Sequence, residues 1–254
     1  MTPVAASNAA RFAEVPIAQG GTPARAWLDW GCQFPPLPLD GCPGLLVVAP
    51  HPDDETLGFG GAAGAIAARG VDVHTVVASD GGAAWPGLSA REQTHLEHSR
   101  RRESRRSAAL LGLRPPTFLG LRDGGLADAE SRLADILTDL LADRVAGTWC
   151  AATWRGDGHP DHEAVGRAAA VATSRTGAVL LEYPVWMWHW ARPGDANVPW
   201  QRATRVILDP VAVERKQHAA AVFRSQLDPD DGRDPIVPPH VLARLQAVGE
   251  VAFR

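Results

Sequence analysis

Short apolar runs alternate with amphipathic or charged stretches along most of the chain. From residue 44 onward the β-branched and apolar runs predict strands, and the stretches between them have the spacing of helices. The predicted strands cover residues 44–50, 71–79, 116–121, 147–154, 178–186 and 203–209. The predicted helices cover residues 57–70, 89–112, 127–144, 162–177 and 210–226. This alternation predicts an α/β fold in which helices cover both faces of a mainly parallel sheet.

Two segments fall outside this alternation. Residues 1–43 are rich in Pro and Gly, as in CQFPPLPLDGCP. Residues 227–240 (LDPDDGRDPIVPPH) have the composition of turns and precede a short closing helix. The chain shows no internal repeat and no low-complexity tract. We therefore expect a single domain over residues 44–254, with residues 1–43 as an N-terminal arm that packs on it.

Composition and charge narrow the class of protein. The 254 residues are 45% hydrophobic and 21% charged, which is ordinary for a globular protein with a sizeable core. The formal net charge of −4 argues against a general nucleic-acid binder, because such proteins need a basic surface. No stretch approaches about 18 consecutive apolar residues, so we expect no integral membrane segment.

The N-terminus and the cysteines bear on the compartment. The stretch MTPVAASNAARFAEV lacks the basic and apolar regions of a signal peptide, so we expect a cytoplasmic protein. Cys32, Cys42 and Cys150 show no CxxC spacing and are expected to be reduced thiols. A bridge between Cys32 and Cys42 stays open as an alternative.

A dense polar cluster follows the first predicted strand. Residues 49–61 read APHPDDETLGFGG, with His51, Asp53, Asp54 and Glu55 at the position where open parallel sheets bind ligands. Three simpler interpretations compete: a helix N-cap, a nucleotide-binding turn and a solvated turn. The nucleotide-binding turn is disfavoured because the spacing is not GxGxxG and phosphates would meet an acidic loop.

A second cluster favours a metal site. The stretch GDGHPDHEAVG (156–166) places His159 and His162 after the predicted strand 147–154, at the same edge of the sheet. Imidazole nitrogens and carboxylate oxygens are common zinc ligands, and a catalytic site uses three of them with water in the open position. His51, Asp54 and His162 would make such a set. Other divalent metals could occupy the same ligands.

These motifs carry a resemblance. HPDDE at 51–55 with HPDH at 159–162 resembles the PIG-L/LmbE family of zinc-dependent N-acetylglucosaminyl deacetylases. The likeness runs from about residue 45 to 170, through the helix RRRESRRSAALLGL and the segment FLGLRDGGL, and resumes at KQHAAAVFRSQL (216–227). It implies a Rossmann-like, three-layer αβα fold, which agrees with the alternation of predicted elements.

The resemblance also implies roles for particular residues. His51, Asp54 and His162 would bind the metal, Asp53 would act as general base, and His159 would act as an electrophilic catalyst. Substrate contacts are implied for the charged helix and the RDG segment, with Arg102, Glu103, Arg105 and Asp123 as the candidates. Some members place a tyrosine two residues before the first histidine of HPDH, where this chain has Asp157.

Amide hydrolysis fits these positions. Zinc lowers the pKa of its water toward 7, and Asp53 is placed to take the proton and return it to the leaving nitrogen. We expect His159 to face the oxyanion as an imidazolium, favoured by the nearby carboxylates of Asp157 and Asp161. The alternative is a neutral ring that hydrogen-bonds to a group supporting the metal ligands. Glu55 is expected to cap amides or brace the loop, in support of the metal ligands.

Tryptophans gather in EYPVWMWHWARPGDANVPW (182–200). Two interpretations stay open for Trp186 and Trp188. They could pack in the core, or they could form a rim on which sugar rings or an acyl chain stack, because indole combines apolar area with a polar group.

Three functions remain in competition at this stage. The first is a zinc-dependent deacetylase that removes the N-acetyl group from an amino sugar or its glycoconjugate. The second is an amidase that acts on a non-sugar amide with the same site, and the third is a non-catalytic sugar-binding module. We expect a small-molecule amino-sugar substrate as partner, no nucleic acid, and leave an oligomer open. A deacetylase explains Asp53, which a binding module would not require.

Overall fold

The structure is a computed structural model that describes residues 6–230 and 232–254. Among these residues seven strands form one sheet in the order β3-β2-β1-β4-β5-β7-β6. The strands are β1 (Leu45–Ala49), β2 (Val73–Ser79), β3 (Thr117–Leu121), β4 (Trp149–Thr153), β5 (Val179–Tyr183), β6 (Ala203–Arg205) and β7 (Val251–Phe253). Strands β1 to β5 are parallel, whereas β7 runs antiparallel to both β5 and β6. The predicted α/β fold with a mainly parallel sheet is confirmed.

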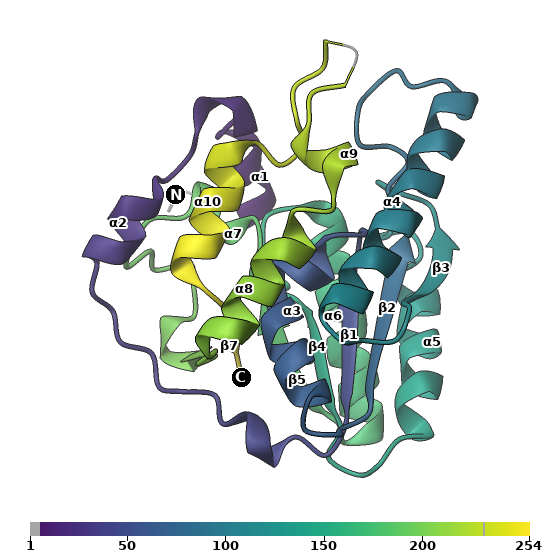
Figure 1. Cartoon of the computed structure of the whole chain (residues 1–254), viewed down its shortest axis with the longest axis vertical. Helices are drawn as coiled ribbons and strands as arrows, with labels where there is room; N and C mark the ends of the chain where they lie inside the picture. The colour runs from purple at the N-terminus through teal and green to yellow at the C-terminus, as the bar shows by residue number, and fades with distance from the viewer. Residues whose placement is uncertain (1–5, 231) are drawn as a thin grey trace, which may run out of the picture.

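Helices cover both faces of this sheet (Figure 1). They are α1 (Asn8–Ala13), α2 (Ala24–Asp29), α3 (Asp54–Ala67), α4 (Ala90–Leu110), α5 (Glu130–Ala142), α6 (Pro160–Thr176), α7 (Met187–Trp190), α8 (Pro210–Ala220), α9 (Arg224–Leu227) and α10 (Pro239–Val248). None of the described helices has both the length and the apolar character needed to cross a lipid bilayer.

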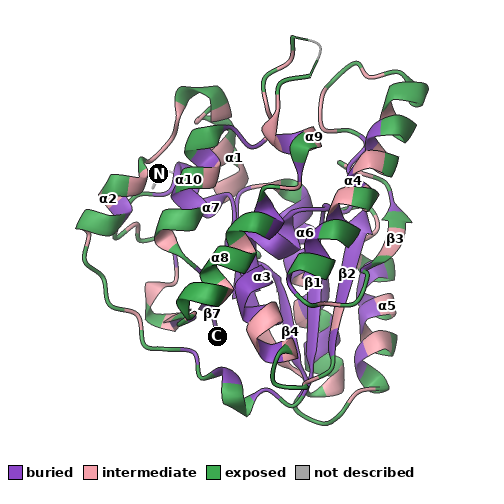
Figure 2. Cartoon of the chain, viewed as in Figure 1, coloured by how far each residue is buried: buried purple, intermediate pink, exposed green. Residues whose placement is uncertain are grey.

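Strand β1 lies between two hydrophobic cores, one on each face of the sheet. Leu45 and Val47 pack on the side of α3, while Leu46 and Val48 pack on the side of α5 and α6. Such a strand is buried on both faces, which is why it reads as a continuous apolar run rather than an alternating one. Figure 2 shows the buried strands between more exposed outer helices.

Glycines let α3 lie close to its neighbours. A Cβ atom at Gly58 would lie 2.2 Å from Cδ2 of Tyr183, and one at Gly61 would lie 2.4 Å from Cδ1 of Leu208. Real Cβ atoms do not approach other atoms so closely, so only glycine fits. The hydroxyl of Tyr183 then donates to the carbonyl of Val48 at 2.8 Å, which ties β5 to β1 across the sheet.

Several element boundaries differ from the predictions. Helix α3 begins at Asp54 and α6 at Pro160, so both helices start inside the polar motifs. The predicted strand 178–186 ends at Tyr183 and is followed by α7, and the predicted helix 210–226 is divided into α8 and α9. Strand β7 was not predicted, because three residues carry too little periodicity to signal a strand.

The N-terminal segment packs on the rest of the chain. The indole of Trp27 is buried and donates to the carbonyl of Trp188 at 3.0 Å. Farther along, Arg205 of β6 donates its N–H to Pro35 at 2.9 Å and accepts one from Leu37 at 2.8 Å. Figure 1 shows this segment running along the outside of the molecule beside α10. The three cysteines are unpaired, so no bridge joins Cys32 to Cys42.

Candidate active site

The two polar motifs meet where the direction of the sheet reverses. Strand β1 is flanked by β2 on one side and by β4 on the other, so the chain leaves β1 and β4 in opposite directions along the sheet. This switch point opens a crevice at the carboxyl ends of the strands. The motif after β1 supplies His51 and Asp54, and the motif after β4 supplies His159 and His162.

Three of these residues form a compact cluster. Ligand atoms of His51, Asp54 and His162 all lie within 4.8 Å of one another, and all three side chains are buried. The Oδ2 atom of Asp54 lies 3.2 Å from Nδ1 of His51 and 3.3 Å from Nε2 of His162. The structure therefore brings together the three ligands expected from the sequence.

The electrostatics of the cluster favour positive charge at this position. Burial opposes ionisation of each group, but the two imidazoles hold the pKa of Asp54 well below its usual range. Burial also opposes the charge of His162, yet Asp54 and Asp157 raise its pKa to about 9. Both ring nitrogens of His162 are buried, and neither makes a hydrogen bond of regular geometry to the described residues. Two imidazole nitrogens and a carboxylate oxygen are a ligand set that fits a divalent cation such as zinc, and a buried ring nitrogen without a hydrogen bond is available to bind it.

Asp157 holds His162 from behind. Its Oδ2 atom lies 2.8 Å from Nδ1 of His162, and both residues are fully buried. The same carboxylate accepts N–H groups of Val185, Trp186 and Met187, each at 2.9 Å. A carboxylate behind a histidine fixes the ring and its tautomer in many metal sites. Asp157 thus connects the cluster of His51, Asp54 and His162 to the segment that follows β5.

Replacement of Asp157 should therefore weaken metal binding. We expect Asp157→Asn to reduce the affinity for zinc about 10–100-fold, because the ring of His162 loses its anionic partner. Competition with a chelator measures this affinity, and a thermal melt of each protein shows that both are folded. A folded variant with wild-type affinity would contradict this role.

The second nitrogen of His51 faces another pair of carboxylates. Its Nε2 atom lies 3.0 Å from Asp123 Oδ1 and 3.3 Å from Asp161 Oδ2. Burial opposes protonation of His51, but these contacts and that with Asp54 raise its pKa well above the usual value. Asp161 also accepts the N–H groups of Gly124 and Leu126, at 2.8 and 3.1 Å. The RDG segment is therefore fixed against the cluster.

Asp53 stands beside the cluster in an unusual backbone conformation. It is the one non-glycine residue with positive φ, at 146°, in the part of the chain that the structure describes. Such strain costs about 1–3 kcal/mol and collects at functional sites. Glu55 stabilises it by accepting the N–H of Asp53 at 3.0 Å and the hydroxyl of Ser104 at 2.8 Å. Glu55 therefore contacts the loop that we expected it to brace, and its supporting role stays a prediction.

The carboxyl group of Asp53 is tuned by burial and by Arg100. Burial raises its pKa to about 7, against the lowering effect of the Arg100 guanidinium. Arg100 donates to Asp53 Oδ1 at 3.2 Å and to the carbonyls of Pro52 and Gly81, both at 3.1 Å. A group with a pKa near neutrality is suited to accept and return a proton.

Arg100 takes the place at the site that we expected for Arg102. Arg102 is exposed on α4 and donates to Ser99 of the same helix at 3.2 Å, so it points away from the cluster. Helical spacing explains the difference, because Leu96, Arg100 and Ser104 follow one another at four-residue intervals on the buried face. That spacing was the signal in the sequence that could have identified Arg100. Of the other candidates on this helix, Glu103 accepts two hydrogen bonds from Ser225 and Arg105 lies over Phe118.

The contacts of His159 favour a neutral ring, whereas we expected an imidazolium, and its catalytic role stays a prediction. Its Nδ1 atom accepts the N–H of Asp161 at 3.3 Å, so the proton is on Nε2. Burial, with the charges of His162 and His51, lowers the pKa of His159 to about 3. The carboxylates of Asp157 and Asp161 are directed at other partners and do not pair with this ring.

A cavity of about 290 Å³ covers the cluster. Its polar floor consists of His51, Asp53, Asp54, Arg100, Asp123 and His159. Its wall is largely apolar and includes Phe12 and Trp186, whose rings lie 5.4 Å apart. Trp188 does not line this cavity; it is buried against Trp27 with ring centroids 5.0 Å apart. Of the two tryptophans, Trp186 therefore lies at the candidate site and Trp188 lies in the core.

Residues 46–173 match the profile of the family described as GlcNAc-PI de-N-acetylase, PIG-L. The match covers half of the chain and contains every residue of the polar floor. The chain belongs to the PIG-L family. The family resemblance expected from the two motifs is confirmed. The apolar wall, by contrast, includes eight residues that lie outside the matched segment: Phe12, Ile17, Val185, Trp186, Ile236, Val237, Val241 and Leu245.

Two relatives of the chain have names that state an activity. A 1D-myo-inositol 2-acetamido-2-deoxy-alpha-D-glucopyranoside deacetylase from Nocardia farcinica is 32% identical over 171 residues, covering 57% of this chain and 56% of that protein. A diacetylchitobiose deacetylase from Thermococcus kodakarensis is 30% identical over 136 residues, covering 52% of this chain and 50% of that protein. The chain thus spans about half the length of the relatives it matches.

A solved structure shows the same fold. The zinc-inhibited form of teicoplanin deacetylase Orf2 superposes with a TM-score of 0.62 and covers 82% of this chain and 96% of that chain. Sequence identity is 19%, so this likeness supports the fold of the PIG-L family member rather than its substrate.

Proposed function

We propose that the protein is a metal-dependent hydrolase that removes the N-acetyl group from an N-acetylglucosamine-containing substrate. One observation carries the proposal: a buried His–Asp–His cluster shares a cavity with Asp53, a carboxyl group free to move a proton. The deacetylases among its relatives agree with this reaction, and the names of two relatives point to N-acetylated amino sugars.

His51, Asp54 and His162 would hold the metal. Zinc is our proposal because two imidazole nitrogens and a carboxylate oxygen are a ligand set that suits it. When bound, zinc supplies a water of lowered pKa and polarises the amide oxygen. Asp157 keeps His162 oriented, and Asp123 and Asp161 keep His51 oriented, so the ligands are positioned before the metal binds.

Asp53 would move the proton. Its carboxylate lines the cavity and is held by Arg100, at 3.2 Å. In the ionised state it takes a proton from the attacking water, and in the protonated state it delivers that proton to the amine that leaves. Both roles need a pKa that permits exchange near neutral pH, as burial provides here.

His159 would donate a hydrogen bond to the oxygen of the tetrahedral intermediate. The neutral ring carries its proton on Nε2, because Nδ1 is occupied by the N–H of Asp161. A donor that is fixed in place before the reaction loses no energy to reorganisation. Because the ring stays neutral over the pH range in which the enzyme would work, its capacity to donate this hydrogen bond does not change with pH.

Replacement of His159 should lower the rate but not shift the pH profile. We expect His159→Ala to reduce kcat about 10²–10³-fold, as for the loss of one oxyanion donor. His159→Gln, which retains an N–H donor, should recover part of that loss. Initial rates between pH 5 and 9 measure both effects. A profile that loses one limb in His159→Ala would show that the ring titrates, against this assignment.

The apolar wall suits the non-polar parts of the substrate. The ring of Phe12 lies 6.2 Å from that of His159 and 5.4 Å from that of Trp186, and all three residues line the cavity. They can contact the acyl methyl group or the apolar face of a sugar ring. Asp123 and Arg100, at the polar floor, can bind sugar hydroxyls.

Acetate release tests the proposal. The metal-loaded protein is incubated with N-acetylglucosamine, N,N′-diacetylchitobiose and N-acetylglucosaminyl-inositol, and with N-acetylated amino acid amides as the non-sugar arm. Turnover of the sugars alone supports the deacetylase. Turnover of the amides alone would favour an amidase, and retained metal without turnover of any amide would favour a binding module.

A further inference from the structure

A short loop of the N-terminal segment closes one side of the candidate active site. This strap, residues 15–22, contains a turn of 3-10 helix at Ile17–Gln19, and Ile17 lines the cavity. None of residues 15–22 is buried. The strap therefore has no hydrophobic core of its own, and segments of this kind open at a small cost in free energy.

Both ends of the strap are anchored to the rest of the chain. Before it, Arg11 of α1 forms an ion pair with Asp195. At its end, the N–H of Thr22 donates to the backbone carbonyl of His189 at 2.9 Å. Burial opposes ionisation of Asp195, but Arg11 lowers its pKa below the usual value, so the first anchor persists in mild acid.

Side chains of α7 and α10 hold three carbonyl groups between these anchors. The contacts run from His189 Nε2 to Val15 at 3.0 Å, from His240 Nε2 to Ile17 at 3.0 Å, and from Arg244 to Gly20. A Cβ atom at Gly21 would lie 2.5 Å from Nδ1 of His189, so the strap lies directly on this ring and only glycine fits there. The position of the strap therefore depends on the state of His189.

The geometry favours a neutral ring at His189. Its Nδ1 atom lies 3.1 Å from Nη1 of Arg244, and because a guanidinium can only donate, Nδ1 accepts. The proton of the ring is then on Nε2, which donates it to Val15. The rings of Phe12 and Trp186, which also pack near His189, carry no charge. Arg244 is buried and forms no ion pair with the residues that the structure describes, so a second proton on Nδ1 would face its positive charge.

Acid therefore favours detachment of the strap. Burial lowers the pKa of His189, the hydrogen bond to Val15 opposes this effect, and the charges of Arg244 and His240 lower the pKa further. Burial also lowers the pKa of Arg244 to about 10, so its guanidinium is charged at neutral pH. Once the strap has left, water reaches the ring of His189 and its pKa returns toward the usual value of about 6.5. The detached state then binds more protons, so the attachment is complete above that pH and is lost as the pH falls below it.

We propose that residues 15–22 form a pH-sensitive strap, which is closed over the cavity at neutral pH and released in mild acid when His189 takes up a proton. Release withdraws Ile17 from the apolar wall, while Arg11 and Thr22 keep the two ends attached. As regulation of the active site this inference rests on the proposed function, but the opening itself is measured without turnover.

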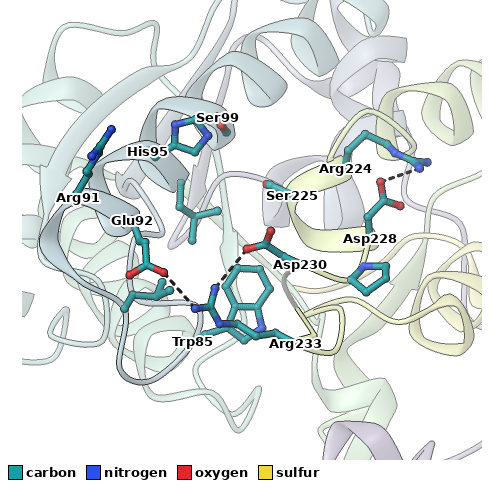
Figure 3. A pocket seen from close by; sticks show the side chains of 13 residues that line it. Trp85, Arg91, Glu92, His95, Ser99, Arg224, Ser225, Asp228, Asp230 and Arg233 are labelled. Carbon is teal, nitrogen blue, oxygen red and sulfur yellow. Dashed lines mark hydrogen bonds and ion pairs between the residues drawn. The ribbon is translucent and has the colours of Figure 1, made fainter.

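A second segment of the cavity wall is held by different chemistry. Ile236 and Val237 line the cavity and follow the turn that carries Arg233. Arg233 pairs with Glu92 at 3.2 Å (Figure 3). Hydrogen bonds from Ser89, together with Arg233, lower the pKa of Glu92 to about 2, so this ion pair is unchanged between pH 5 and 8. The segment therefore serves as an internal control for the strap.

Hydrogen–deuterium exchange measures the opening. The metal-loaded full chain is exchanged between pH 5 and 8, and each rate is divided by the intrinsic rate of an unstructured peptide at that pH. We expect the protection of residues 15–22 to fall several-fold from pH 8 to pH 5, while residues 232–237 keep theirs. Exchange is measured rather than activity, because acid also titrates Asp53. Equal loss in both segments, or no loss in the strap, would overturn the proposal.

Matched variants assign the effect to His189. The side chain introduced by His189→Gln can still accept from Arg244 and donate to Val15, but it does not titrate, so the protection of the strap should no longer change with pH. His240→Gln is the control, because His240 is exposed and contacts Ile17 rather than Arg244. It should keep the pH dependence of the wild type. A pH dependence that persists in folded His189→Gln would overturn the assignment.

The ring of His189 in the wild type gives an independent reading, which decides even where the variant does not fold. Its nitrogen signals are followed by NMR in ¹⁵N-labelled protein and assigned by correlation to the backbone. We expect a neutral ring with its proton on Nε2 at pH 8 and an imidazolium at pH 5, and an imidazolium at pH 8 would contradict the proposal. Absence of turnover on every amide would count against the proposed function and leave these measurements unaffected.

Discussion

Asp53→Asn is expected to reduce kcat by about 10²–10⁴-fold, the range for loss of a general acid–base group. The substitution keeps the size of the side chain and removes both its capacity to exchange a proton and the negative charge that pairs with Arg100. Because Asp53 is not one of the three clustered ligands, zinc content should stay at that of the wild type. Acetate release under saturating substrate, together with metal analysis of the same preparation, measures both quantities.

The pH dependence gives a second view of Asp53. The ionised carboxylate is the active form, so the rate is lost as the pH falls through its pKa. Burial places this pKa at about 7 in the protein alone, and a bound cation would lower it. We therefore expect an acidic limb below pH 7 in the wild type and no such limb in Asp53→Asn. Wild-type rates in Asp53→Asn at all pH values would rule out this residue as the base.

His162→Gln is expected to abolish both zinc binding and turnover. Gln keeps much of the volume of the ring but lacks a nitrogen that can bind the metal. The loss of affinity should exceed the 10–100-fold effect expected for the supporting residue Asp157. Activity should then fall to the rate of the zinc-free protein, because His51 and Asp54 supply only two of the three ligands.

The matched control for His162→Gln is His74→Gln. His74 lies on β2, away from the cluster, and its ring bonds Thr117 at 2.9 Å and Arg144 at 2.8 Å. Removal of His162 leaves Asp54 and Asp157 buried without their partner, which can cost about 3–5 kcal/mol of stability. A thermal melt must therefore show that the variant is folded. Zinc retained by folded His162→Gln, with lost activity, would contradict the ligand assignment.

The central part of the fold could be predicted because its signals are local. Strand β1 is buried on both faces and reads as LLVVA, and α5 has its leucines along one face. Strand β7 has three residues and pairs with β5 and β6 only because the end of the chain folds back. Helix α7 follows a predicted strand because Asp157, distant in sequence, binds the amides that begin it. Tertiary contacts of this kind leave no periodicity to read.

The residues of the site likewise divide into those that the sequence could predict and those that it could not. His51, Asp54 and His162 stand in motifs at two strand ends, so the topology alone brings them together. Phe12 and Trp186 reach the cavity through packing of segments that have no motif. The state of His159 could not be predicted, because sequence proximity does not show where the carboxylates of Asp157 and Asp161 point. In the structure they bind His162 and His51 instead.

The location of the metal tests the account most directly. A second group of possible ligands, His51 with Asp123 and Asp161, lies next to the first. An anomalous difference map from crystals grown with zinc distinguishes the two groups. We expect a single peak bonded to His51, Asp54 and His162, with the carboxyl group of Asp53 beside it and unbonded. A peak held by Asp123 and Asp161, or by Asp53, would contradict the proposed chemistry.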